Sequence, residues 1–127
     1  MMNLQQALAE WGAGMGLELQ PGHSGALQLR YPATGALLGV AEHEGQIVVH
    51  YADPLTHDAA QRLLQALRHA GQLQEPAQAV QVGLRNTAAG DWLVVATRFA
   101  SADASGARIE QAVQYLRQWL AQAQSES

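Results

Sequence analysis

The stretch that decides the fold is residues 37–53, LLGVAEHEGQIVVHYAD. Two apolar runs meet at Glu44-Gly45, and a two-residue turn ending in glycine between such runs is typical of a β-hairpin. With this turn His43 lies opposite Gln46, and the register then predicts which side chains share a face. One face is expected to carry Leu38, Val40, Ile47, Val49 and Tyr51, and the other Leu37, Gly39, Ala41, Val48 and His50. The first face is large and apolar, and we expect helices to cover it.

Turn signals on both sides of this hairpin predict three further strands. Residues 32–35, Pro-Ala-Thr-Gly, separate one short alternating stretch from the hairpin. Further along, two alternating stretches flank a turn at Asn86 to Asp91 and form a second hairpin. The expected strands are Leu27 to Tyr31, Leu37 to His43, Gln46 to Ala52, Val80 to Leu84 and Trp92 to Phe99.

The N-terminal segment predicts an amphipathic helix that begins after Asn3, a favourable N-cap. Glycines at positions 12, 14 and 16 are expected to end it. They do not follow a strand, so a phosphate-binding loop is disfavoured. The apolar stripe of this helix consists of Leu4, Leu8, Trp11 and Met15.

Two more helices are expected. One follows an N-cap at Asp53 or Thr56 and ends at Gly71, and the other is capped near Asp103 or Ser105. Their apolar stripes are Ala60, Leu63, Leu64 and Leu67, and Ile109, Val113, Leu116 and Leu120 with Tyr115 and Trp119 on the flank. Residues 1–127 are therefore expected to form one α+β domain, with about five antiparallel strands and three helices in the order α-β-β-β-α-β-β-α.

Composition narrows the function. Apolar residues make up 48% of the 127 residues and charged residues 14%, a balance typical of a folded chain. There is no cysteine, and the net charge is -4, which argues against thiolate metal sites and against nucleic-acid or anionic-lipid partners. No apolar run approaches the roughly 20 residues of a membrane span, and the N-terminus lacks a signal-peptide pattern. We expect a cytoplasmic protein that does not insert into membranes.

The five histidines do not predict a metal or catalytic site. His43 and His50 share a face but lie about 13 Å apart at roughly 3.3 Å per strand residue. His57 and His69 lie about 18 Å apart on one helix. We therefore expect surface or turn histidines, no cofactor, no metal and no enzymatic activity.

Apolar surface is in excess, because three helices cannot easily cover both faces of a five-stranded sheet. Leftover apolar surface on a folded domain usually marks a partner interface. A homodimer could bury the second helix together with the strand Val80 to Leu84.

The order of elements resembles the class I type III secretion chaperones, the family of the Tir chaperone. The resemblance rests on the first helix, Leu63-Leu64, Val82-Gly83-Leu84 before a turn, Trp92, and the closing helix with aromatic residues near its end. It spans about Leu4 to Leu120. Many members have Ala-Asn after the paired leucines, where this chain has Gln65-Ala66-Leu67, and the usual Leu-Pro after the last strand is replaced by Ala100-Ser101.

The resemblance implies a homodimeric cytoplasmic virulence chaperone that binds the N-terminal segment of a secreted effector and keeps it extended for export. It places cargo contacts at Leu4, Leu8, Trp11, Met15, Leu29, Leu38 and Val40. It places the dimer interface at Leu63, Leu67, Val80, Val82 and Leu84. Two alternatives stay open: the first-helix residues could pack in the chain's own core, and the protein could be a dimeric α+β adaptor or regulatory subunit unconnected with secretion.

Overall fold

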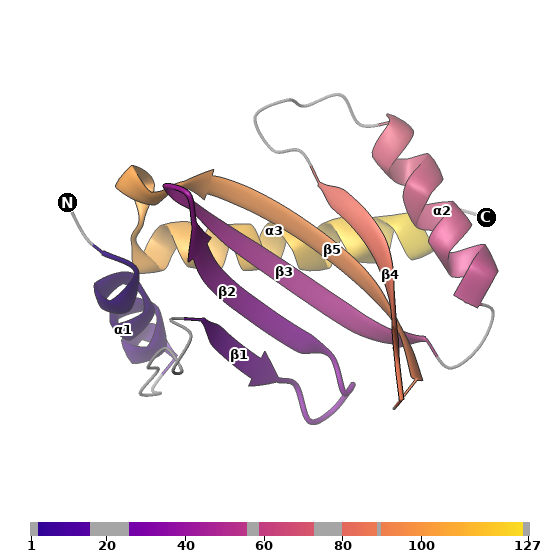
Figure 1. Ribbon diagram of the computed structural model, residues 1–127, viewed down its shortest axis with the longest axis horizontal. Coiled ribbons are helices and arrows are strands. Elements are labelled where there is room, and N and C mark those ends of the chain that lie inside the picture. Colours follow the sequence, from indigo (N-terminus) through magenta and orange to yellow (C-terminus); the bar gives the residue numbers. More distant parts are fainter. Residues whose placement is uncertain (1–2, 16–25, 56–58, 73–79, 89, 126–127) are drawn as a thin grey trace.

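The computed structural model describes residues 3–15, 26–55, 59–72, 80–88 and 90–125. They form an α+β fold with a five-stranded antiparallel sheet in the spatial order β1-β2-β3-β5-β4, which confirms the predicted fold class and element order (Figure 1). The helices are α1 (Leu4–Gly14), α2 (Ala59–Gln72) and α3 (Gly106–Ser125), with a short 3-10 helix, Ser101–Asp103, before α3. The strands are β1 (Leu27–Arg30), β2 (Leu37–His43), β3 (Gln46–Leu55), β4 (Gln81–Thr87) and β5 (Gly90–Ala100).

The β2-β3 hairpin has the predicted turn and register. Glu44 and Gly45 have φ angles of 51° and 78°, the left-handed pair that a type I′ turn requires. His43 pairs with Gln46, so the two predicted faces are confirmed. β3 is longer than predicted and runs through Pro54, which pairs with β5 only. Because β2 begins at Leu37, opposite Ala52, it does not reach Pro54, and the missing proline N–H breaks no ladder on the β2 side.

The second hairpin is also tighter than predicted. Pairing between β4 and β5 continues to Thr87 opposite Gly90, which leaves a shorter loop than the predicted turn at Asn86 to Asp91.

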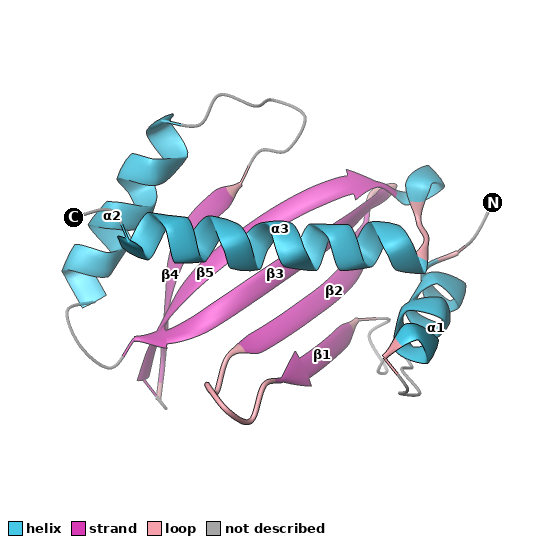
Figure 2. Ribbon diagram, turned by 180° about the vertical axis from the view of Figure 1, so that it is seen from behind, coloured by secondary structure: helices cyan, strands magenta, loops and turns pink. Residues whose placement is uncertain are grey.

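The core lies between α3 and one face of the sheet, with α1 at the end of this layer and α2 beside β4 (Figure 2). The large side chains of the first predicted face are all buried here, together with the apolar stripe of α3. The largest fully buried side chains are Leu8, Leu38, Ile47, Leu93, Ile109, Leu116, Val40, Val49 and Val95.

Side-chain caps fix where two of the helices begin. Asn3 and Gln6 form a capping box at α1, and the Ser105 hydroxyl accepts a hydrogen bond from the Arg108 N–H at 3.0 Å in the first turn of α3. α1 continues through Gly12 to Gly14, so Gly12 does not end it as predicted; this glycine is buried. Asp53 does not cap α2, because it belongs to β3 and pairs with Arg62 at 2.6 Å.

The other face of the sheet has no described helix on it, and Figure 1 looks directly onto it. It carries the second predicted set of side chains, most of which are half-buried by their neighbours alone. Part of the expected excess of apolar surface therefore lies on this face, while the exposed large apolar side chains, Met15, Leu64, Leu67 and Leu84, lie elsewhere.

Candidate functional site

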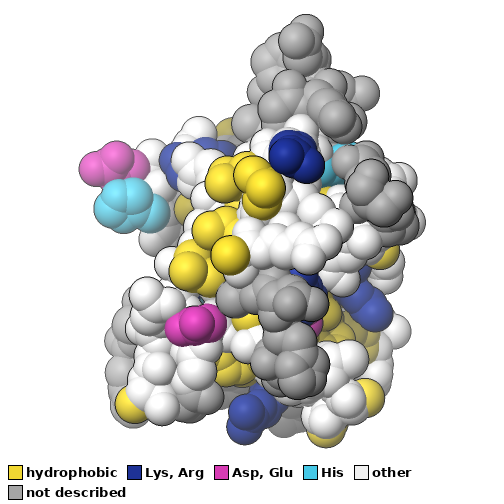
Figure 3. All heavy atoms as spheres, turned by 90° about the vertical axis from the view of Figure 1, so that its right-hand side faces the viewer, with side chains coloured by type: hydrophobic (Ala, Val, Ile, Leu, Met, Phe, Trp, Pro, Cys, Tyr) yellow, Lys and Arg dark blue, Asp and Glu magenta, His cyan; other side chains and the backbone are white. Residues whose placement is uncertain are grey.

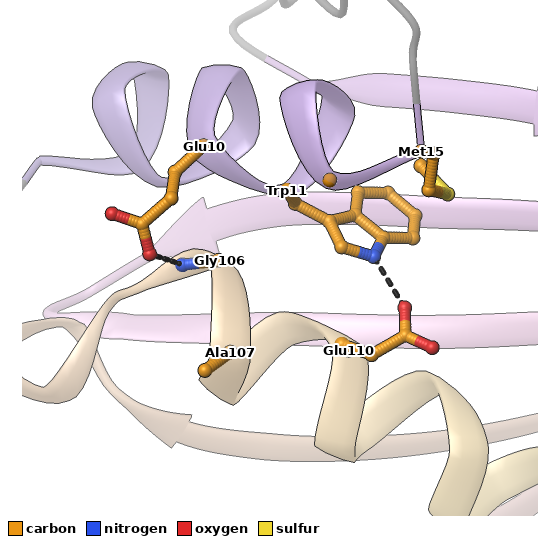
Figure 4. A pocket seen from close by; sticks show the side chains of 7 residues that line it. Glu10, Trp11, Met15, Gly106, Ala107 and Glu110 are labelled. Atoms are coloured by element: carbon orange, nitrogen blue, oxygen red, sulfur yellow. Dashed lines mark hydrogen bonds between the residues drawn. The ribbon is translucent and has the colours of Figure 1, made fainter.

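A hollow of about 410 Å³ lies where the end of α1 meets the beginning of α3. Figure 4 shows the Trp11 indole and Met15 on one wall and Glu110 of α3 on the other. The lining residues are Glu10, Trp11, Gly14, Met15, Gly106, Ala107 and Glu110. We call this hollow the α1–α3 pocket.

Close packing of the two helix backbones forms one end of the pocket. A Cβ atom at Gly106 would lie 2.8 Å from the backbone nitrogen of Trp11 and 3.0 Å from the carbonyl carbon of Glu10, so only glycine fits there. Gly106 donates its backbone N–H to Glu10 Oε1 at 2.8 Å, which satisfies one of the unpaired amides at the start of α3. This contact holds α1 across the N-terminus of α3.

A second bond between the helices orients the indole. Trp11 Nε1 donates to Glu110 Oε2 at 2.6 Å, and Gln114 donates to the other carboxylate oxygen at 2.9 Å. These bonds from Gln114 and Trp11 hold the pKa of Glu110 below its usual 4.5, so this carboxylate is charged at neutral pH. The pocket therefore has an aromatic and thioether wall with a fixed negative charge at its rim.

The pocket brings together only part of the predicted cargo residues. Trp11 is 4% exposed and Met15 is 43% exposed, and both line the pocket. Leu29 is half-buried on edge strand β1. The remaining predicted residues, Leu4, Leu8, Leu38 and Val40, lie in the protein's own core. In this conformation they contribute through packing and offer almost no surface to a partner.

Sequence reasoning missed Glu10, Gly106 and Glu110. Trp11 and Glu110 are 99 positions apart, and no local pattern links them. The available signal was general: a buried indole N–H requires an acceptor, which its own helix did not provide.

The predicted dimer residues also fall into an exposed group and a group packed against the protein's own core. Leu67 on α2 is 49% exposed and Leu84 on β4 is 42% exposed. Leu63, Val80 and Val82 are half-buried against the protein's own core. Leu64, 47% exposed on α2, was not among the predicted dimer residues and belongs with the exposed pair. Figure 3 shows hydrophobic side chains gathered on the side of the molecule that carries α2.

The described histidines occupy different environments. His43 is exposed in the hairpin beside Glu44, and His50 lies on the uncovered sheet face. His69 is 4% exposed, contrary to the expectation of a surface residue, and meets the Trp119 ring edge-on at 4.9 Å between centroids. Within the described ranges no group of three His, Cys, Asp or Glu residues is placed to hold a metal ion. No helix in these ranges is long and apolar enough to span a membrane. His23 and His57 lie outside the described residues.

No protein-family model and no curated protein sequence matches this chain. Solved structures do match. The Yersinia pestis type III secretion chaperone SycH, in complex with a stable fragment of YscM2, superposes with a TM-score of 0.68 at 18% identity, over 95% of this chain and 99% of that chain. The chain has the fold of the type III secretion chaperones.

Two further structures share this fold. A chain of the HopA1–SchA chaperone–effector complex matches with a TM-score of 0.61 at 13% identity, over 90% of this chain and 87% of that one. YbjN from E. coli, a proposed transcription regulator, matches with a TM-score of 0.63 at 11% identity, over 91% and 87%. At these identities the likeness defines the fold, and the partner has to be argued from the surface.

Proposed function

We propose that this protein is a homodimeric cytoplasmic chaperone that binds the N-terminal segment of a type III secretion effector and keeps it extended for export. The observation that carries the proposal is the extent of the fold match: nearly the whole of SycH, itself bound to a fragment of another protein, aligns with nearly the whole of this chain. The accessible apolar pocket on α1 and α3 supports it, because such a site suits side chains of an unfolded segment.

The α1–α3 pocket is the proposed anchor for the cargo. An aliphatic side chain of an extended segment enters between Trp11 and Met15, and a volume of about 410 Å³ is large enough for such a group. Beyond the pocket, β1 forms one edge of the sheet and carries half-buried Leu29. A cargo strand added at this edge would gain backbone hydrogen bonds, which bind any sequence and so suit an export chaperone.

The proposed dimer interface consists of the exposed leucines on α2 and β4. Leu64 and Leu67 are three residues apart on one face of α2, and β4, which carries Leu84, lies beside this helix. Three half-exposed leucines at one end of the molecule form the kind of self-complementary patch that a twofold interface buries.

A second candidate function is a dimeric adaptor or regulatory subunit without a role in secretion. The YbjN match favours it, because a proposed transcription regulator has the same fold at a similar TM-score. The two functions differ in the partner: a chaperone captures an unfolded segment, whereas an adaptor binds a folded surface.

Affinity capture from the native cytosol, followed by protease trimming and mass spectrometry, tests the proposed function. The tagged protein is compared with Met15→Glu, which places a charge at the rim of the pocket, and with Ala13→Glu, which places the same charge on an exposed α1 position outside the lining. We expect the wild type and Ala13→Glu to protect one short N-terminal segment of an exported protein, and Met15→Glu to lose it. Recovery of folded proteins only would favour the adaptor.

The dimer is tested separately by light scattering. The wild type is expected at twice the 13.6 kDa chain mass, and Leu67→Glu at the chain mass itself, because the substitution buries an unpaired charge in the interface. Gln111→Glu, at an exposed position on α3 outside the proposed interface, is the control and should stay dimeric. A dimeric Leu67→Glu protein would remove α2 from the interface.

A further inference from the structure

The uncovered face of the sheet is apolar at its centre. By register, Leu37, Ala52 and Val94 form a row across β2, β3 and β5, and each neighbouring row adds more apolar side chains. The face also carries Ala41, Val48, Pro54, Trp92 and Ala96. No described helix covers these side chains, although the solvent face of an antiparallel sheet normally carries polar side chains.

The charges on this face all have one sign. Three arginines surround the apolar centre: Arg30 on β1, Arg85 on β4 and Arg98 on β5. The carboxylates of the described strands, Glu42, Asp53 and Asp91, point to the opposite face, the one that α3 covers. Three of the seven arginines of a chain with net charge -4 are therefore collected on one surface that bears no strand carboxylate.

None of these three arginines makes an ion pair within the described part of the chain. Arg98 donates to the side-chain oxygens of Gln46 and Gln81, at 3.4 and 3.0 Å, which hold the guanidinium on this face. The described ion pairs lie elsewhere, at His43–Glu44 and Arg62–Asp53.

Small residues leave room for the His50 ring to lie against the sheet. Gly39 and Ala96 flank His50 in one row, and the imidazole lies over Gly39, where a Cβ atom would be 1.9 Å from His50 Cε1. The ring is thus packed against Gly39 on β2, in the row next to Leu37, Ala52 and Val94. Five strands span roughly 19 Å at about 4.8 Å per strand, which is wide enough for one helix of about 10–12 Å diameter.

We propose that this face binds an acidic amphipathic helix of a partner protein, with an aliphatic stripe on the row Leu37–Ala52–Val94 and carboxylates against the three arginines. A second copy of this chain does not fit, because a twofold contact through the face would oppose like charges. The aliphatic centre favours a protein over a nucleic acid, because nucleic acids are bound through positive charge along the backbone and aromatic side chains that stack on the bases. This site goes beyond the proposed cargo pocket, which lies with α3 on the other side of the sheet.

The experiment uses the full chain and two synthetic 18-residue helical peptides with the same leucine stripe, one flanked by glutamates and the other by lysines. Affinities are measured by fluorescence anisotropy at low and high salt. We expect the acidic peptide to bind at least tenfold more tightly than the basic one, and to lose affinity as salt rises. The double variant Arg85→Glu, Arg98→Glu should weaken the acidic peptide about tenfold or more, the scale of two solvent-exposed ion pairs, whereas Arg68→Glu on α2 should leave it unchanged.

Three results would overturn the proposal. Equal binding of both peptides, or of neither, would remove the charge complementarity. A DNA duplex or single-stranded RNA that binds with the same arginine dependence, in place of the acidic peptide, would assign the face to nucleic acid. Loss of the dimeric mass in Val94→Glu would make the face a contact between copies. None of these outcomes bears on capture of an effector segment by the α1–α3 pocket, so the two proposals fail independently.

Discussion

Replacing Gly106 with alanine tests how closely α1 and α3 pack. The added Cβ atom would lie 2.8 Å from the Trp11 backbone nitrogen and 3.0 Å from the Glu10 carbonyl carbon. Both are backbone atoms, so α1 itself must move, and overpacking of this kind costs about 1–3 kcal/mol. The shift also strains the Glu10–Gly106 hydrogen bond, worth about 0.5–1.5 kcal/mol, while helix propensity returns about 0.5–1 kcal/mol. The free energy of unfolding should fall by about 2 kcal/mol.

Urea unfolding followed by tryptophan fluorescence, at one protein concentration because of the proposed dimer, measures this loss. Gly14→Ala is the matched control: it lines the same pocket in α1, and no atom lies within 4 Å of its added Cβ. Better helix propensity should make this variant equal to or up to about 1 kcal/mol more stable than the wild type. Equal stability of Gly106→Ala and the wild type would refute the close helix contact and with it the shape of the α1–α3 pocket.

Three further predictions concern single side chains. Trp11→Phe keeps an aromatic ring but removes the N–H donor to Glu110. The free energy of unfolding should fall by about 1–2 kcal/mol, and NMR titration should show a higher pKa for Glu110. An unchanged pKa would contradict the hydrogen bond. Burial, and then the positive charge of Arg85, lower the pKa of His50 below 6.5. As the pH falls below 6.5, the folded state therefore binds fewer protons than the unfolded state, and the free energy of unfolding should fall. His50→Asn should abolish this part of the decrease in urea unfolding measured at several pH values. Asp53→Asn weakens the 2.6 Å ion pair with Arg62, which connects β3 to α2. Thermal unfolding should show that the free energy of unfolding falls by about 1 kcal/mol. An unchanged unfolding midpoint would show that the ion pair does not stabilise the fold.

Local rules were sufficient to predict the five strands and the register of the β2–β3 hairpin, but not the pairing of β3 with β5. Glu44-Gly45 fixes a two-residue turn, the turn fixes the register, and the register fixes which side chains reach the core. The two caps are equally local: Asn3 caps α1 as predicted, and Ser105 is one of the two caps predicted for the last helix. The wrong predictions concern residues whose secondary structure is decided by tertiary contacts.

The clearest example is Gly12, which the sequence suggests as a helix end. It lies inside α1 and is buried, because packing outweighs its poor helix propensity. Asp53 likewise belongs to β3, since pairing with β5 extends that strand beyond Ala52, the last β3 residue that pairs with β2.

The candidate site was only half predictable. The stripe of α1 was visible in the sequence, but which of its members face solvent depends on how α3 crosses the helix, and that crossing depends on Gly106 and Glu110. Periodicity shows that a helix has an apolar side; it does not separate the core residue Leu8 from the pocket residue Met15.

The proposed function requires that the α1–α3 pocket hold an unfolded segment of an exported protein. A photo-crosslinking amino acid in place of Met15, with the same group in place of Ala13 as control, tests this most directly in cells that make the protein. We expect light-dependent crosslinks from position 15, and far fewer from position 13, to the N-terminal region of a protein that is later exported. Crosslinks from position 15 to folded domains only, or equal crosslinks from both positions, would contradict it.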